Sequence, residues 1–214
     1  MPTSDSTATA KTRARPTPTP VVKPRSRGIA GLVLAPGASA GRDQPALVAI
    51  DEAVSLSKVV VVRIDFPNRL AGRRAPDRPP VLLATVVDAA KALASTAGVA
   101  PRRIALGGRS MGGRICSMAV AEGLPAAGLV LVSYPLHPPG KPDRLRTDHF
   151  GALEVPCLFV SGTRDAFGSR DELEDATRTI PGPVTHVWID GGDHGLRGKD
   201  SQVAGIVREW VTEH

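Results

Sequence analysis

Short apolar runs alternate with longer stretches of helical periodicity, and this alternation constrains the fold more than any other feature of the chain. The run Val59–Ile64 begins with four consecutive valines. Continuous apolar runs of this length are typical of strands buried on both faces of a sheet. Six runs are expected to form strands: Ile29–Ala35, Val59–Ile64, Ile104–Leu106, Leu129–Ser133, Leu158–Val160 and Val184–Ile189.

Between these runs, apolar residues recur at helical spacing. Near the C-terminus, from Val203 to Val211, they fall at i, i+3, i+4, i+7 and i+8, which is a full amphipathic stripe. Asp43 is expected to cap an earlier helix that has Pro45 in its first turn. Alternating strands and helices predict an α/β fold, a three-layer sandwich with a mostly parallel sheet of about six strands and helices on both faces. The shorter helical stripes are Leu47/Ile50/Val54, Leu82/Val86/Ala89/Leu93 and Ile115/Met118/Ala119.

The chain has the size of one domain, with 214 residues of which 42% are hydrophobic. Residues 1–27 are rich in Thr, Ser, Pro and Arg, and we expect a disordered tail there, before a folded domain over residues 28–214. The net charge is +6, but the tail holds six basic residues against one acidic residue. The domain is therefore close to neutral, and no nucleic-acid partner is expected.

Cysteine usage and hydropathy exclude several classes of protein. Cys116 and Cys157 both lie in apolar stretches, and they are expected to be reduced core residues of a cytoplasmic protein. No run of about 18 apolar residues occurs, so no membrane span is expected. No Cys/His cluster has zinc spacing, and we expect neither a metal nor a cofactor. A homo-oligomer is compatible with the sequence.

The loop after the third expected strand carries the most informative motif, Gly108-x-Ser110-x-Gly112. A nucleophile on a sharp strand-to-helix turn needs small neighbours two residues away on either side. The turn places the hydroxyl at a helix N-terminus, where backbone N–H groups can stabilise an oxyanion. The bare motif also fits a Gly-rich turn or a phosphate-binding loop, although the Lys-Ser/Thr ending of a P-loop is missing.

A serine nucleophile needs a base, and the base needs an acid that orients it. In sheets of this type the order along the chain is Ser, Asp or Glu, His. His194 follows the last strand within Gly191–Gly195, and Asp165 follows the penultimate strand, so these two residues are predicted as base and acid. The other histidines lie inside a strand, at the chain end or in a Pro-rich loop: His186, His214, His137 and His149.

Two further loops at the same edge offer binding groups. The small residues of Leu34–Gly41 let the N–H of Ala38, together with that of Met111, form an oxyanion hole, with Ser39 as an alternative donor. The loop 66–80 contains Arg69 and Arg73, which are candidates for steering an anionic substrate; the alternative is a solvated loop. His137 is a further candidate for lining the pocket.

These loops together resemble the α/β-hydrolase fold, and more narrowly the dienelactone-hydrolase-like members of the KANL/Tex type. The resemblance implies Ser110 as nucleophile, Asp165 as acid and His194 as base. Dienelactone hydrolases proper have Cys where this chain has Ser110, so their substrate is not carried over. The short insert 134–152 implies a compact fold with little or no cap. The matching stretches are Leu34–Gly41, Asp65–Pro79, Gly107–Gly113, Ser133–Pro142, Ser161–Asp165 and Gly191–Gly195.

The function expected from these residues is that of a serine hydrolase acting on a small-molecule acyl substrate. Ser110 would cleave a small or exposed carboxylic ester or thioester through an acyl-enzyme. Two alternatives stay open. One is a non-catalytic interaction module that retains the fold, and the other is a peptidase or acyltransferase that uses the same triad, because reaction choice depends on pocket shape and access of water.

Overall fold

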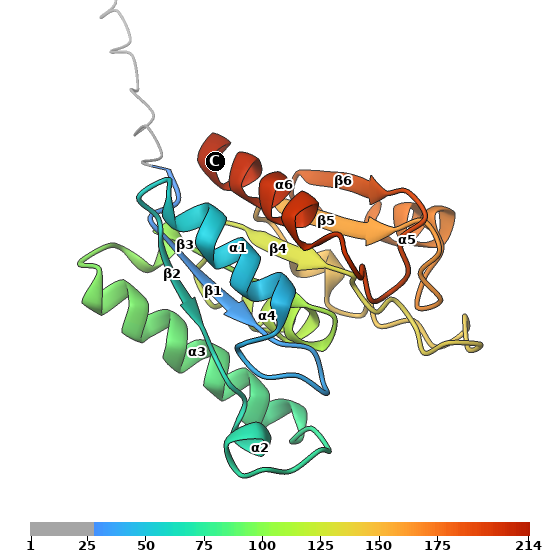
Figure 1. The fold of residues 1–214 in the computed structure, drawn as a ribbon, viewed down its shortest axis with the longest axis horizontal. Helices are drawn as coiled ribbons and strands as arrows, with labels where there is room; N and C mark the ends of the chain where they lie inside the picture. The colour runs from blue at the N-terminus through green and yellow to red at the C-terminus, as the bar shows by residue number, and fades with distance from the viewer. Residues whose placement is uncertain (1–27) are drawn as a thin grey trace, which may run out of the picture.

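The computed structural model describes residues 28–214, so the tail expected over residues 1–27 lies outside the described residues. Its centre is a six-stranded sheet in the order β2-β1-β3-β4-β5-β6, and every neighbouring pair is parallel (Figure 1). The strands are β1 (Gly31–Ala35), β2 (Val60–Arg63), β3 (Ile104–Arg109), β4 (Leu129–Val132), β5 (Cys157–Gly162) and β6 (Val184–Ile189).

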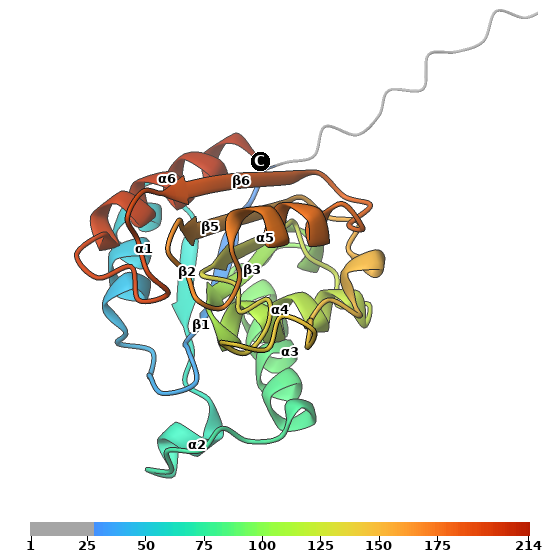
Figure 2. The ribbon, with the colours of Figure 1, turned by 90° about the vertical axis from the view of Figure 1, so that its right-hand side faces the viewer.

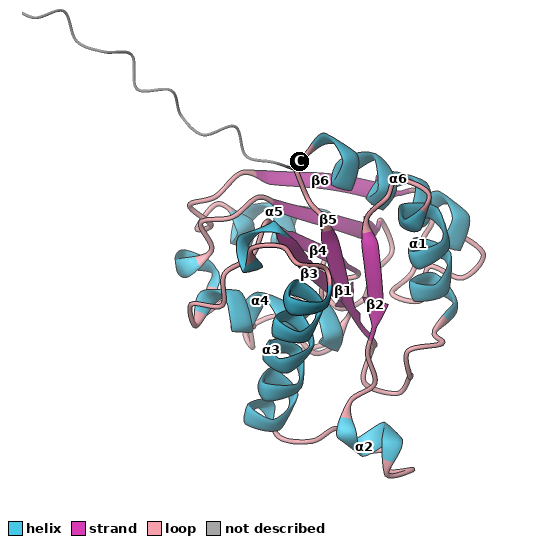
Figure 3. Cartoon of the chain, turned by 90° about the vertical axis from the view of Figure 1, so that its left-hand side faces the viewer, coloured by secondary structure: helices cyan, strands magenta, loops and turns pink. Residues whose placement is uncertain are grey.

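Helices cover both faces of this sheet. Figures 2 and 3 show α1 and α6 together on one face and α3, α4 and α5 on the other. The helices are α1 (Pro45–Ser55), α2 (Pro67–Leu70), α3 (Pro79–Thr96), α4 (Met111–Ala121), α5 (Arg170–Thr177) and α6 (Asp200–Glu213). The three-layer α/β sandwich predicted from the alternation is confirmed.

Two apolar cores lie between the layers. In one core, Leu47 of α1 and Val203 of α6 are fully buried against the sheet. In the other, Val86 of α3 and Ile115 of α4 are buried against the opposite face. Burying each such side chain contributes about 1.5–3 kcal/mol, so the stripes predicted at helical spacing hold the layers together.

Strand β2 differs from the expectation of burial on both faces. It is an edge strand that pairs only with β1, and Val60 is 49% exposed. The four valines therefore indicate a strand correctly, but they do not reveal that it lies at the edge.

The start of α1 and the loop 66–80 also differ from the sequence-based expectation. Gln44, not Asp43, is the N-cap residue of α1, and its side chain makes no capping hydrogen bond. Asp43 instead forms an ion pair with Arg63, at 3.0 Å. The loop 66–80 contains the short helix α2, which was not predicted and which projects from the sheet edge in Figure 3.

The connection between β4 and β5, residues 133–156, carries only the 3-10 helix η2 (Phe150–Ala152). No separate cap domain therefore stands over the sheet within residues 28–214. Cys116 and Cys157 are buried free thiols, and burial raises the pKa of each to about 12, so both stay protonated. In the described part of the chain, no helix has the length and apolarity needed to cross a bilayer.

Candidate active site

Ser110 lies in the turn between β3 and α4 with a strained backbone, at φ 51° and ψ −118°. A non-glycine residue at positive φ costs about 1–3 kcal/mol, which the surrounding structure must offset. The flanking glycines permit this turn, because a Cβ on Gly108 or on Gly112 would lie 2.1 Å from the carbonyl oxygen of Ala35 in β1. The predicted need for small residues on both sides of Ser110 thus has a direct steric cause.

His194 and Asp165 reach the same edge of the sheet from two later loops. The Oγ of Ser110 lies 2.8 Å from Nε2 of His194. On the other side of the ring, Nδ1 lies 2.8 Å from Oδ2 and 3.0 Å from Oδ1 of Asp165. The Asp165 side chain is only 2% exposed, so its carboxylate is held in one position beneath the imidazole.

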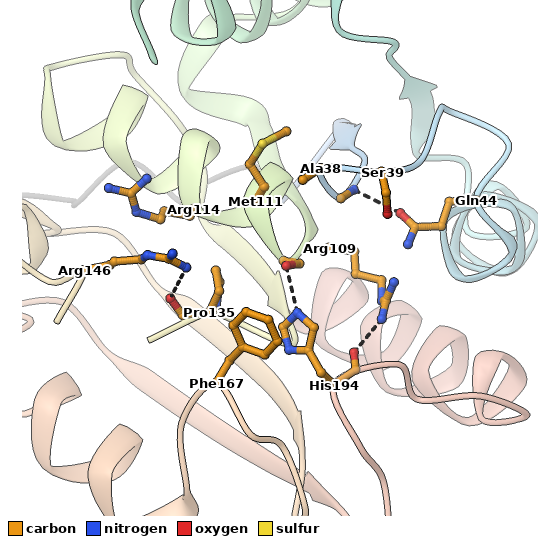
Figure 4. Close-up of a pocket in the computed structure, with 12 residues that line it drawn as sticks. Ala38, Ser39, Gln44, Arg109, Met111, Arg114, Pro135, Arg146, Phe167 and His194 are labelled. Carbon is orange, nitrogen blue, oxygen red and sulfur yellow. Dashed lines mark hydrogen bonds between the residues drawn. The ribbon is translucent and has the colours of Figure 1, made fainter. Parts of the chain in front are cut away.

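The loop that carries His194 is fixed by close backbone packing. Gly192 approaches Gly162 at the end of β5 so closely that a Cβ on Gly162 would lie 2.2 Å from the Gly192 carbonyl oxygen. That oxygen accepts a hydrogen bond of 2.8 Å from the N–H of Arg164. Arg109 donates from its guanidinium to the carbonyl oxygen of His194, as Figure 4 shows. These contacts join the ends of β3 and β5 to the loop of the imidazole.

Phe167 is a site residue that sequence reasoning missed. Its ring stacks on the His194 imidazole with centroids 3.9 Å apart, and its N–H donates to Oδ1 of Asp165 at 2.8 Å. One residue therefore orients both the acid and the ring. The only signal in the sequence is an aromatic residue two positions after Asp165.

The loop after β1 brings backbone donors to Ser110. Neither the N–H of Ala38 nor that of Met111 has a hydrogen-bond acceptor among residues 28–214. The loop is held by Gln44, whose Oε1 accepts from the N–H of Gly37 at 3.1 Å. Asp65, at the end of β2, accepts from the N–H of Arg42 at 2.7 Å.

Ser110 and His194 line a cavity of about 420 Å³. Figure 4 shows His194 among the labelled residues around it. No Asp or Glu is among its lining residues. Its wall consists of Gly37, Ala38, Ser39, Gln44, Arg109, Ser110, Met111, Arg114, Pro135, Arg146, Phe167 and His194. The structure thus brings together Ser110, His194, Ala38, Met111 and Ser39, with Asp165 directly behind His194.

The three side chains predicted to bind substrate do not line this cavity. Arg69 belongs to α2, and Arg73 is paired with Asp77 at 2.7 Å. His137 is 5% exposed, and its Nδ1 donates to the carbonyl oxygen of Pro138 at 2.9 Å. The arginines in the wall are Arg109, Arg114 and Arg146 instead.

A second Ser–His hydrogen bond lies deeper in the molecule. The Oγ of Ser117, in α4, is 2.8 Å from Nε2 of His149. Ser117 is fully buried, and no carboxylate among residues 28–214 hydrogen-bonds His149. No cluster of three or more His, Cys, Asp or Glu side chains in the described region is arranged to hold a metal ion.

Comparison with known proteins agrees with this architecture. The model of the alpha/beta hydrolase domain family matches residues 28–208, and the chain belongs to this family. A dienelactone hydrolase from Anabaena variabilis superposes with a TM-score of 0.70 at 19% identity, over 88% of each chain.

Two other solved structures have the same fold at similarly low sequence identity. Est1E from Butyrivibrio proteoclasticus has a TM-score of 0.70 at 15% identity, covering 88% of this chain and 89% of its own. A serine hydrolase without a lid from Xanthomonas campestris has a TM-score of 0.68 at 17% identity, covering 89% of this chain and 85% of its own. At these identities the likeness concerns the fold.

Proposed function

We propose that this protein is a serine hydrolase that cleaves a small or exposed carboxylic ester or thioester through an acyl-enzyme on Ser110. The observation that carries the proposal is the continuous hydrogen-bonded line from Ser110 Oγ through the His194 ring to the Asp165 carboxylate. The line ends at a cavity, so an acyl group has access to the hydroxyl.

In the first half of the reaction, His194 Nε2 takes the proton of Ser110 as Oγ attacks the substrate carbonyl carbon. The same proton then passes to the leaving oxygen or sulfur, and the carbonyl–leaving-group bond breaks. Asp165 holds the tautomer with the proton on Nδ1, so that Nε2 is free to act as base, and it stabilises the imidazolium that forms. Water repeats the sequence on the acyl-enzyme and releases the acid and Ser110.

The negative charge that develops on the carbonyl oxygen needs donors that are already in place. The N–H groups of Ala38 and Met111 have no competing acceptor among residues 28–214 and belong to the cavity wall next to Ser110. A donor of this kind contributes about 3–4 kcal/mol when it is aimed at the oxyanion. We assign these two amides to the oxyanion hole.

The absence of a cap domain within residues 28–214 supports a substrate that is small, or an acyl group presented on a larger molecule. We also propose that the chain is a dienelactone-hydrolase-like member of the family, and the stretches Asp65–Pro79 and Ser133–Pro142 support this narrower resemblance. The Est1E and dienelactone hydrolase neighbours are compatible with ester chemistry on this fold.

Stopped-flow mixing with p-nitrophenyl acetate and p-nitrophenyl butyrate tests the proposal. The expected result is a burst of p-nitrophenolate equivalent to the enzyme concentration, followed by steady turnover, with an acyl adduct on the intact protein by mass spectrometry. Acetyl and butyryl thioesters of pantetheine form the second substrate pair. A properly folded protein that turns over none of these and forms no adduct would contradict the proposal.

A further inference from the structure

Three arginines line the cavity that contains Ser110, and within residues 28–214 none of them forms an ion pair. Among residues 28–214, no Asp or Glu forms an ion pair with Arg109, Arg114 or Arg146. Partly buried arginines are normally paired with a carboxylate. Arg63 shows the usual arrangement, with Asp51 at 2.9 Å and Asp43 at 3.0 Å.

The three arginines divide into two groups around His194. Figure 4 shows Arg109 on one side of the imidazole and Arg114 with Arg146 on the other. Arg109 is engaged in holding the loop of His194 through the carbonyl oxygen of that residue. Within residues 28–214, the guanidinium groups of Arg114 and Arg146 make no such hydrogen bond to the loop of His194. We call these two residues the arginine pair.

The arginine pair is held close together without a counter-charge. Burial and the neighbouring charge of Arg114 both lower the pKa of Arg146, in that order of importance. Among residues 28–214, the guanidinium of Arg146 donates only to the carbonyl oxygen of Pro135, at 3.3 Å, and Nε of Arg114 is buried with no hydrogen-bond partner. Two like charges in such a place repel, and an unsatisfied buried donor costs further free energy.

The side chains around the arginine pair do not supply the missing charge. Burial raises the pKa of Tyr134, so the phenol is neutral, and its hydroxyl donates to the carbonyl oxygen of Arg146 at 2.6 Å. Burial lowers the pKa of His149 to about 4, so its imidazole is neutral at physiological pH. Ser117 is an uncharged hydroxyl. This end of the cavity is therefore positive.

We propose that the arginine pair binds an oxyanion, a carboxylate or a phosphate, that the substrate carries apart from its reacting carbonyl. The inference rests on the proposed function for the reaction, but the anion site itself is a property of Arg114 and Arg146. Guanidinium groups suit both anions, because their forked donors match two oxygens at once. An anion in the cavity would accept from the terminal N–H groups of the two side chains and relieve the repulsion between the guanidinium groups.

Equilibrium binding tests the site without any need for turnover. The ligands are adipate against adipamide for the carboxylate, and phosphopantetheine against pantetheine for the phosphate, measured by calorimetry. We expect at least one anion to bind about tenfold or more tightly than its neutral counterpart, as one charge-assisted hydrogen bond allows. Arg114→Gln and Arg146→Gln should each remove the preference. Arg208→Gln, on the exposed face of α6, is the matched control and should keep it.

The anion that binds more tightly indicates whether the substrate carries its charge on the acyl chain or on the leaving group. A preference for adipate indicates an acidic acyl chain, whereas a preference for phosphopantetheine indicates a phosphorylated leaving group. If neither anion is preferred by the folded protein, or if both single variants keep the preference, the anion site is overturned. Arg146 is only partly buried, so Arg146→Gln should fold. This variant therefore still tests the site if Arg114→Gln fails to fold.

Kinetics separate the failure of this inference from the failure of the hydrolase proposal. The charged substrates are the mono-p-nitrophenyl ester of adipic acid and butyryl-phosphopantetheine, compared with p-nitrophenyl butyrate and butyryl-pantetheine. We expect the charged member of one pair to have a lower KM than its neutral counterpart, and the arginine variants to raise the KM of the charged ester by a larger factor than the KM of the neutral ester. Ester turnover with no charge preference overturns the anion site alone. Anion binding without turnover of any ester overturns the hydrolase proposal alone.

Discussion

Residues 28–214 contain two Ser–His hydrogen bonds of the same length, and the two differ in burial, backbone geometry and the partners of the histidine. Ser110 and His194 meet at 2.8 Å at the mouth of a cavity, with Asp165 on the far nitrogen of the ring. Ser117 and His149 also meet at 2.8 Å, but Ser117 is fully buried within α4, and its Oγ also donates to the carbonyl oxygen of Arg114. The distance between the two side chains therefore does not distinguish a reactive serine from a structural one.

The two pairs differ in the backbone conformation of the serine, in its access to the cavity and in whether a carboxylate orients the histidine. Ser110 has positive φ in a turn that projects its hydroxyl, whereas Ser117 lies inside regular helix. The His194 ring is oriented from both sides, by Asp165 and by the stacked Phe167. His149 has no hydrogen-bonded carboxylate among residues 28–214, and burial together with the charge of Arg114 lowers its pKa to about 4. We expect only the first pair to react.

Removing the Ser110 hydroxyl should have the largest effect. Ser110→Ala leaves the cavity and the amide donors but no nucleophile, so kcat on p-nitrophenyl butyrate should fall by about 10⁴- to 10⁶-fold. Steady-state kinetics under identical conditions measure the loss. A variant that keeps more than a tenth of the wild-type rate would place the nucleophile elsewhere.

Neutralising the acid should have the next largest effect on the Ser110 pair. Asp165→Asn keeps the shape of the side chain but favours the wrong imidazole tautomer, and kcat should fall by about 10⁴-fold. The loss should appear in kcat rather than in KM. Asp193→Asn, next to His194 in sequence, is the control and should leave the rate within about threefold, since isolated surface changes have small effects. Equal losses in both variants would reject Asp165 as the acid.

The buried pair should instead affect how stability depends on pH. The pKa of His149 is lowered from 6.5 to about 4 in the folded protein. The unfolded chain therefore binds more protons than the folded one between these values, and the free energy of unfolding should decline as pH falls from 6.5 toward 4. His149→Gln should flatten that part of the profile in urea denaturation. An unchanged slope in His149→Gln would contradict the burial of this imidazole.

Ser117→Ala should be the mildest change. It leaves Nε2 of His149 without its partner, which should cost about 1–2 kcal/mol of stability. Ester hydrolysis should stay within about threefold of wild type, because the cavity and the Ser110–His194 pair are untouched. Thermal unfolding and kinetics on the same preparation check both parts. A loss of activity as large as that of Ser110→Ala, in a folded variant, would make the two pairs equivalent.

The pattern of the sequence predicts the layers well, because local periodicity reports which face of each element is buried. Apolar runs marked all six strands, and the stripe ending at Val211 marked α6. The edge position of β2 escaped prediction, since strand order depends on packing between distant segments. Asp43 was wrong as a cap because Arg63, twenty positions away, offers it an ion pair.

The candidate site was predictable where chain order and turn chemistry determine it. Ser110, Asp165 and His194 follow from the elbow and from the loops after successive strands, and the structure brings them together; their catalytic roles stay predictions. Arg114 and Arg146 could not be found this way, because they come from α4 and from the β4–β5 connection and meet only in three dimensions. The local density of arginine in the loop 66–80 instead predicted an anion site there, and Arg69 and Arg73 do not line the cavity.

Mapping a fluorophosphonate adduct tests whether Ser110 is the nucleophile. Trypsin cleaves after Arg109 and after Arg114, so the two serines fall in different peptides, residues 110–114 and residues 115–144. We expect one adduct per molecule, on the peptide 110–114, in wild type and in Ser117→Ala. An adduct on the peptide with Ser117, or no adduct on a folded protein, would contradict it.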